Sequence, residues 1–267
     1  MLEPQIESHD LETWAGYLIE HSLGGVGPGD RVMIKGERIC WPLMEVLERR
    51  VVEAGGVPDI YLVPPNNERG RVWSATVARH GDPELMDKVP EWHRERYQSM
   101  TKYVEVLGAE DPARYMGLGT DQVRALAAVD REFANIRLSK PWVITLFPTP
   151  AFAVIEGMSA EEYTEFIVRA STVDPSPLKT AEEAIAPLVA EGRQVRIETA
   201  HPDTGRSLVL EMDISPSRPV LSYGMRNFPD GEIFTSPDAR SVTGEIFVDL
   251  PVNYGGRSEE HTSELQS

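Results

Sequence analysis

Apolar positions in the first half of the chain follow the periods of helices and strands in alternation. Residues 11, 14, 15, 18, 19 and 23 are apolar, a helical spacing that predicts a helix over 11–23. A strand at 31–35, a helix at 41–54 and a strand at 59–63 are predicted to follow. This βαβ order indicates a parallel sheet.

The middle of the chain continues the alternation with a polar interruption. Residues 66–112 are polar with scattered aromatic side chains, and we expect helices whose aromatic stems pack on the sheet. A helix is predicted at 122–136 and a buried strand at 141–147. Ser159 and Glu162 have the spacing of a capping box, which predicts a helix at 161–170 with Tyr163, Phe166 and Ile167 inward.

The pattern becomes β-rich after a short helix predicted at 181–190. Residues typical of strands then recur between turn signals. The predicted strands are 194–199, 207–212, 219–223, 232–235 and 244–248. The sequence therefore predicts an α/β fold, with an N-terminal βαβ parallel-sheet domain at 1–190 and a β-rich domain at 191–256.

Composition narrows the classes of function. The 267 residues are 41% hydrophobic and 26% charged, which is typical of a soluble globular protein. A net charge of −17 argues against nucleic-acid and anionic-membrane partners, because both reward an excess of Lys and Arg. The single cysteine, Cys40, excludes a disulfide framework and a Cys-rich zinc site. With no signal peptide or membrane span in the pattern, we expect a cytoplasmic protein.

The candidate chemistry is a carboxylate in residues 227–237. Pro229 and Gly231 supply a turn, with glycine free to take a positive φ, and Glu232 lies between that turn and a short apolar run. One interpretation is a hairpin turn with solvated carboxylates. The other is a glutamate placed to bind a metal ion.

Other familiar motifs are missing from the sequence. The glycines at 24–29 precede the first strand, whereas those of a nucleotide-binding loop follow it. His80 and His93 have no His partner four residues on, so we expect them to be surface or capping residues. No nucleophile elbow occurs in the sequence. Cys40 is expected to be a buried, inert thiol. The sequence thus assigns no catalytic and no cofactor-binding residue, and Glu232 stands as the one metal-site candidate.

Residues 227–237 resemble the metal-site strand of the metalloaminopeptidase family of aminopeptidase T and aminopeptidase S. The family pattern is Asn-x-Pro-x-x-Glu-Val-Phe-Thr-x-Pro, and Glu232 matches its ligand glutamate. Residues 18–54 and 147–174 resemble the family's opening and middle segments. The resemblance implies a cytoplasmic, homodimeric enzyme that releases N-terminal amino acids from peptides with two divalent metal ions, chosen from Zn, Co, Mn and Mg.

The end of the chain departs from this pattern. Residues 257–267 show no logic of secondary structure and resemble the translation of a sequencing adapter. In the family the other ligands lie beyond the Glu232 position, so we expect a C-terminally truncated fragment that is inactive alone. The alternative is a non-catalytic α/β binding or assembly domain.

Overall fold

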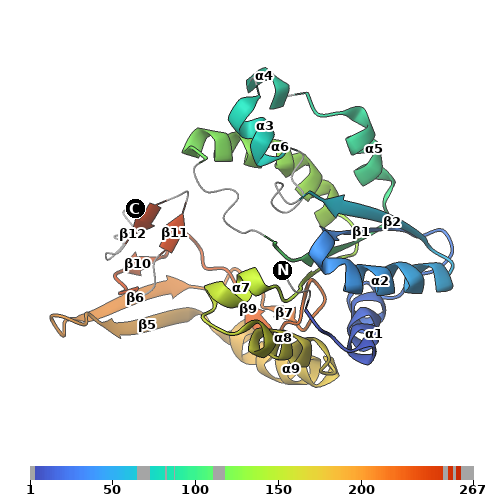
Figure 1. Ribbon diagram of the computed structural model, residues 1–267. Coiled ribbons are helices and arrows are strands. Elements are labelled where there is room, and N and C mark those ends of the chain that lie inside the picture. The colour runs from blue at the N-terminus through green and yellow to red at the C-terminus, as the bar shows by residue number, and fades with distance from the viewer. Residues whose placement is uncertain are drawn as a thin grey trace. The chain divides into compact units, whose positions relative to one another are not determined.

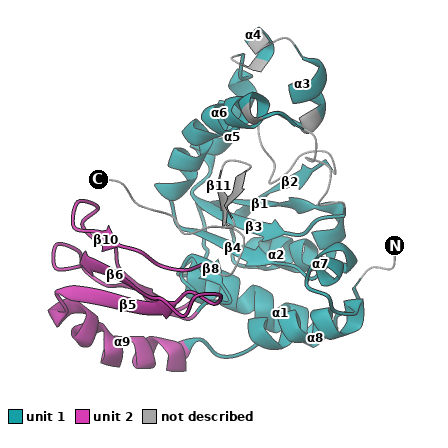
Figure 2. Ribbon diagram, turned by 90° about the vertical axis from the view of Figure 1, so that its left-hand side faces the viewer, with its two compact units in different colours: residues 1–175, 224–230 teal, residues 176–223, 231–267 magenta. Residues whose placement is uncertain are grey.

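The computed structural model describes residues 4–64, 73–81, 83–86, 88–110, 118–248, 252–254 and 257–259 (Figure 1). The chain forms two compact units (Figure 2). Unit 1 comprises residues 1–175 and 224–230, and unit 2 comprises residues 176–223 and 231–267. The chain therefore leaves unit 1 twice, and the domain boundary near residue 190 stays a prediction.

A five-stranded parallel sheet organises unit 1, in the order β2-β1-β3-β4-β8. Its strands are β1 (Arg31–Glu37), β2 (Val57–Val63), β3 (Lys102–Leu107), β4 (Trp142–Leu146) and β8 (Asn227–Phe228). The predicted α/β class with a parallel sheet is confirmed. The strand β8 joins the edge of the sheet from a segment that follows most of unit 2 in the sequence.

Helices cover both faces of this sheet (Figure 1). Adjacent residues of β1 point to opposite faces, so Ile34 belongs to one core and Met33 to the other. The Ile34 core is packed by α1 (Ser8–Gly16), its π-helical continuation η1 (Tyr17–Ser22), η2 (Arg38–Cys40), α2 (Trp41–Glu53), α7 (Pro150–Ile155) and α8 (Ala160–Ser171). The Met33 side is covered by α5 (Glu91–Ser99) and α6 (Thr120–Leu138), and α3 (Ala75–His80) and α4 (Pro83–Met86) contact α6.

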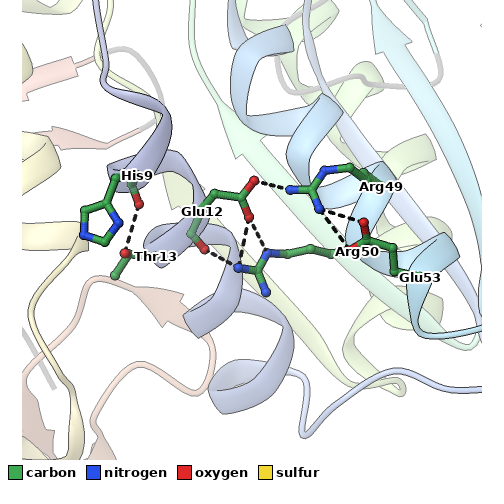
Figure 3. A network of polar contacts seen from close by, with 6 residues as sticks. All are labelled: His9, Glu12, Thr13, Arg49, Arg50 and Glu53. Carbon is green, nitrogen blue, oxygen red and sulfur yellow. Dashed lines mark hydrogen bonds and ion pairs between the residues drawn. The ribbon is translucent and has the colours of Figure 1, made fainter.

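Ion pairs join α1 to α2 at the surface (Figure 3). Glu12 accepts hydrogen bonds from both Arg49 and Arg50, with 3.1 Å from Arg50 Nε to Glu12 Oε2. Arg50 also donates to the Glu12 carbonyl at 2.8 Å, and Arg49 pairs with Glu53 one turn along α2. These contacts fix the register of α1 on α2, next to the buried Leu11, Trp14 and Leu47.

Three details of the helical prediction are wrong. Residues 102–107, expected to be helical, form the central strand β3. Trp92 is 64% exposed, so it does not pack on the sheet. On α8, Tyr163 and Ile167 face the core as predicted, but Phe166 is 51% exposed and does not. The predicted capping box of α8 is confirmed, since Ser159 accepts from the Glu162 amide at 3.2 Å and Glu162 accepts from the Ser159 amide at 3.1 Å.

Unit 2 is a helix followed by short antiparallel strands. The helix α9 (Ser176–Glu191) is longer than predicted. The two strands predicted next, β5 (Gln194–Ala200) and β6 (Ser207–Asp213), pair as an antiparallel hairpin, with β10 (Thr243–Gly244) beside β6. The strand β7 (Val220–Ser222) pairs with β9 (Glu232–Phe234). A strand over 244–248 was expected, but regular pairing there stops at Gly244.

The last described residues form a further antiparallel pair. The strand β11 (Val252–Tyr254) pairs with β12 (Arg257–Glu259), although no regular element was expected beyond residue 256. Residues 260–267 lie outside the described residues, and the adapter interpretation stays a prediction. Within the described ranges, no helix is both long enough and apolar enough to cross a membrane.

Candidate functional site

Glu232 is the first residue of β9 and is exposed. It lies opposite Ser222 of β7, and the register continues through the pairs Leu221–Ile233 and Val220–Phe234. The predicted short strand after Pro229 and Gly231 is confirmed, but Gly231 does not adopt a positive φ. The strand therefore presents a carboxylate at its start, where an ion could reach it.

The same motif begins inside unit 1. Phe228 of β8 is buried, and its ring lies 5.8 Å from that of Tyr17. Gly224, just upstream, has φ of 94° and accepts a 2.6 Å hydrogen bond from the Ser22 hydroxyl, and a Cβ there would lie 2.9 Å from the Phe228 ring. Glycine is thus needed at this entry to β8. The single motif read from the sequence is two structural elements, one in each unit.

Glu182 is a carboxylate of unit 2 that sequence reasoning missed. It is 5% exposed on α9, and its Oε2 accepts a 2.8 Å hydrogen bond from the backbone N–H of Ser222. Its Oε1 is buried without a hydrogen-bond partner. Because Ser222 is the residue opposite Glu232, Glu182 anchors the strand that supports the candidate ligand. The adjacent Glu183 is exposed, so composition could not distinguish the two glutamates.

A metal centre needs several ligands, and the described residues do not complete one. Among them, no group of three or more His, Cys, Asp and Glu side chains is placed to hold a metal ion. His80 and His93 belong to unit 1, as does Asp230, whereas Glu232 belongs to unit 2. The exposed carboxylate suits the role of one ligand, but the part of the chain that the structure describes supplies no complete set.

A second polar site lies in unit 1, between the sheet and the helices α5 and α6. We call it the α5–α6 cavity; its volume is about 510 Å³. The lining residues are Lys35, His93, Tyr97, Tyr103, Glu105, Leu107, Ala127, Asp130, Arg131, Phe133, Ala134, Arg137, Ile144 and Asn227. Lys35, Glu105, Ile144 and Asn227 come from one row across the sheet, because each is the register partner of the next. No motif in the sequence indicated this site.

A buried ion pair lies at the floor of the cavity. Lys35 Nζ is 3.3 Å from Glu105 Oε1, and both side chains are less than a tenth exposed. The Tyr103 hydroxyl donates a 2.8 Å hydrogen bond to Glu105 Oε2. Burial raises the pKa of Tyr103, and the Glu105 charge beside it acts in the same direction, so this hydroxyl keeps its proton.

His93 is buried, contrary to the expectation of a surface or capping residue. It is 2% exposed, and its ring lies 4.7 Å from Phe133 and 5.2 Å from Tyr97. Burial lowers the pKa of His93 to about 4, helped by the positive charges of Lys35 and Arg96. The imidazole is therefore neutral at pH 7.

Cys40 is buried at the start of α2, as expected. Burial raises the pKa of its thiol, and the negative charge of Glu37 adds to the effect. The thiolate, which is the reactive form, is therefore suppressed. The predicted burial of Cys40 is confirmed, and its low reactivity stays a prediction.

Comparisons with known proteins give a family match and several matches to solved structures. The profile of the family described as thermophilic metalloprotease (M29) matches residues 7–262. No curated protein matches the sequence.

Of the solved structures, wild-type AmpT from Thermus thermophilus is similar with a TM-score of 0.72 at 18% identity, over 97% of this chain and 69% of AmpT. A 2,5-dihydroxypyridine dioxygenase from Pseudomonas putida KT2440 gives a TM-score of 0.47 at 12% identity, over 91% of this chain and 60% of its own, a likeness too low to support an argument. The AmpT match confirms the α/β fold with its five-stranded parallel sheet.

Proposed function

The chain belongs to the thermophilic metalloprotease (M29) family, and from that premise we propose that it is a metal-dependent aminopeptidase. Metalloproteases hydrolyse peptide bonds with a divalent metal ion, so peptides are the substrate class. Removal of single N-terminal residues is the finer proposal, supported by the likeness of residues 227–237 to the metal-site strand of the aminopeptidases T and S. The single observation that carries the proposal is the family match over residues 7–262.

Glu232 is our proposed metal ligand. It is exposed at the start of β9, and carboxylates suit hard and borderline divalent ions such as Mg, Mn, Co and Zn. When bound, such ions polarise a scissile carbonyl and lower the pKa of an attacking water. The family resemblance supports two ions per site, with the other ligands contributed by residues beyond Glu232.

In this proposal, the strand β7 and the side chain of Glu182 hold Glu232 in position. Glu182 holds the backbone of Ser222, and β7 in turn fixes β9 through three residue pairs. This arrangement presents Glu232 on a paired strand, which restricts its carboxylate more than a free loop would.

We further propose a cytoplasmic homodimer, a C-terminal domain that begins near residue 191, and no activity for the 267-residue chain alone. The last point is supported by the described residues, which include no group of three candidate ligands.

The experiment compares two leucine substrates with the product of the complete reading frame. We expect release of leucine from a peptide with a free N-terminus, none from its N-acetylated form, loss of activity with a chelator, and recovery with Mg²⁺, Mn²⁺, Co²⁺ or Zn²⁺. Equal cleavage of the acetylated peptide would contradict the aminopeptidase proposal. A protein that cleaves neither substrate with any of these ions would support the alternative of a non-catalytic binding or assembly domain.

A further inference from the structure

Two buried nitrogen atoms on the wall of the α5–α6 cavity have no hydrogen-bond partner: Nε2 of His93 and one terminal nitrogen of Arg137. Buried polar atoms are paired in the great majority of cases, so an orphaned pair beside one cavity requires an explanation. His93 packs on Phe133, and Arg137 follows Phe133 by one turn of α6. Both side chains therefore lie beside Phe133, and both line the same cavity.

The guanidinium group of Arg137 is held in place by aromatic rings. Its central carbon lies 4.8 Å from the Trp142 ring centre and 5.6 Å from that of Tyr103. Stacking of this kind positions the planar group and leaves its edge for a ligand. Arginine presents paired N–H donors that match the two oxygens of a carboxylate.

The charges around the cavity select the ligand's charge. Lys35, Arg131 and Arg137 are cationic, and Glu105 and Asp130 are anionic, which leaves one excess positive charge among the lining residues that the structure describes. Lys35 and Glu105 pair with each other, and His93 is neutral. A ligand with one negative charge balances this excess positive charge. A doubly charged phosphate would exceed it, and its surplus negative charge would be repelled by Glu105 and Asp130.

The remaining lining is apolar or aromatic, with Tyr97, Phe133, Leu107, Ile144 and two alanines. A volume of about 510 Å³ lies within the usual range of small-molecule sites, roughly 300–1,000 Å³. We propose that the α5–α6 cavity binds a small monocarboxylate with an apolar body, its carboxylate on Arg137 and His93. The proposed metal ligand, Glu232, is not among the residues that line this cavity.

The test measures binding of three probes to the full chain at pH 7 by titration calorimetry and ligand-observed NMR. The probes are 3-phenylpropionate, its uncharged analogue 3-phenylpropan-1-ol, and inorganic phosphate. We expect the carboxylate to bind with a dissociation constant below about 1 mM, and the alcohol and phosphate at least tenfold more weakly. Failure of the carboxylate to bind, or equal affinity for either other probe, would overturn the proposal.

Variants locate the site. Arg137→Gln removes the positive charge and is expected to weaken 3-phenylpropionate binding at least tenfold. His93→Phe removes the unpaired nitrogen while keeping a ring, and is expected to weaken binding several-fold. Arg124→Gln is the matched control, because Arg124 lies on the same helix with a 76% exposed side chain. Circular dichroism checks that each variant is folded. If Arg137→Gln does not fold, the comparison of His93→Phe with the wild type decides the test. Unchanged binding in the folded variants, or an equal loss in the control, would contradict the assignment.

Discussion

At the scale of single residues, the polar groups of unit 1 are buried in ways that their sequence neighbours do not reveal. Lys35 and Glu105 are 70 positions apart, and each looks like a surface residue of its own segment. The fold brings them to 3.3 Å because β1 and β3 are neighbours in the sheet. Only long-range pairing makes the two charges compatible with burial, so no local pattern could predict the pair.

His93 gives a prediction on pH. Its folded-state pKa, about 4, is below the ordinary 6.5, so protonation favours the unfolded chain. The stability that neutral, buried His93 gives to the folded state is fully present above pH 6.5 and is lost as the pH falls toward 4. Between pH 7 and pH 4.5 we expect the wild type to lose roughly 2–3 kcal/mol more unfolding free energy than His93→Phe, by linkage. Urea denaturation of both proteins at the two pH values checks this; parallel losses would show that His93 does not titrate in this way.

At the scale of elements, local patterns predicted the regular pieces well. The strand β1, the helix α2 and the strand β2 were predicted within two residues, because their apolar periods are clear. The strand β3 was missed, because Lys102 and Glu105 interrupt its apolar run and polar segments surround it. Glu232 was correctly predicted at the start of a strand. Glu182 was not singled out, because its role in anchoring β7 depends on a contact with Ser222 that is distant in the sequence.

The attachment of α5 to the sheet depends on Arg96. Its guanidinium donates to both oxygens of Asp59 at 2.9 and 3.1 Å and to the Ile60 carbonyl at 2.6 Å, and it stacks 4.3 Å from the Tyr61 ring centre. Charge-assisted bonds of this kind contribute about 2 kcal/mol. We expect Arg96→Met to lower the unfolding free energy by about that amount in urea titrations.

Arg94→Met is the matched control for this prediction. Arg94 lies on the same helix and pairs with Glu132, whose side chain is 44% exposed, so its removal should cost less. An equal loss in the two variants would indicate that Arg96 has no special part in holding α5.

At the scale of the whole molecule, the chain combines two units with different polar sites. The family match gives metalloprotease chemistry to the chain, and the candidate ligand Glu232 belongs to unit 2. The α5–α6 cavity belongs entirely to unit 1. Composition and motifs predicted the class and the family, but the cavity could not be predicted, because its lining comes from strands and helices that are far apart in the sequence.

The central claim, that Glu232 is a metal ligand of an aminopeptidase, is tested most directly by the metal content of Glu232→Gln in the product of the complete reading frame. The matched control is Glu191→Gln, which alters another exposed glutamate of unit 2. We expect Glu232→Gln to lose bound metal and leucine-anilide hydrolysis together, the latter by about a hundredfold or more on loss of a ligand, and the control to keep both. Unchanged metal stoichiometry in folded Glu232→Gln would contradict the assignment.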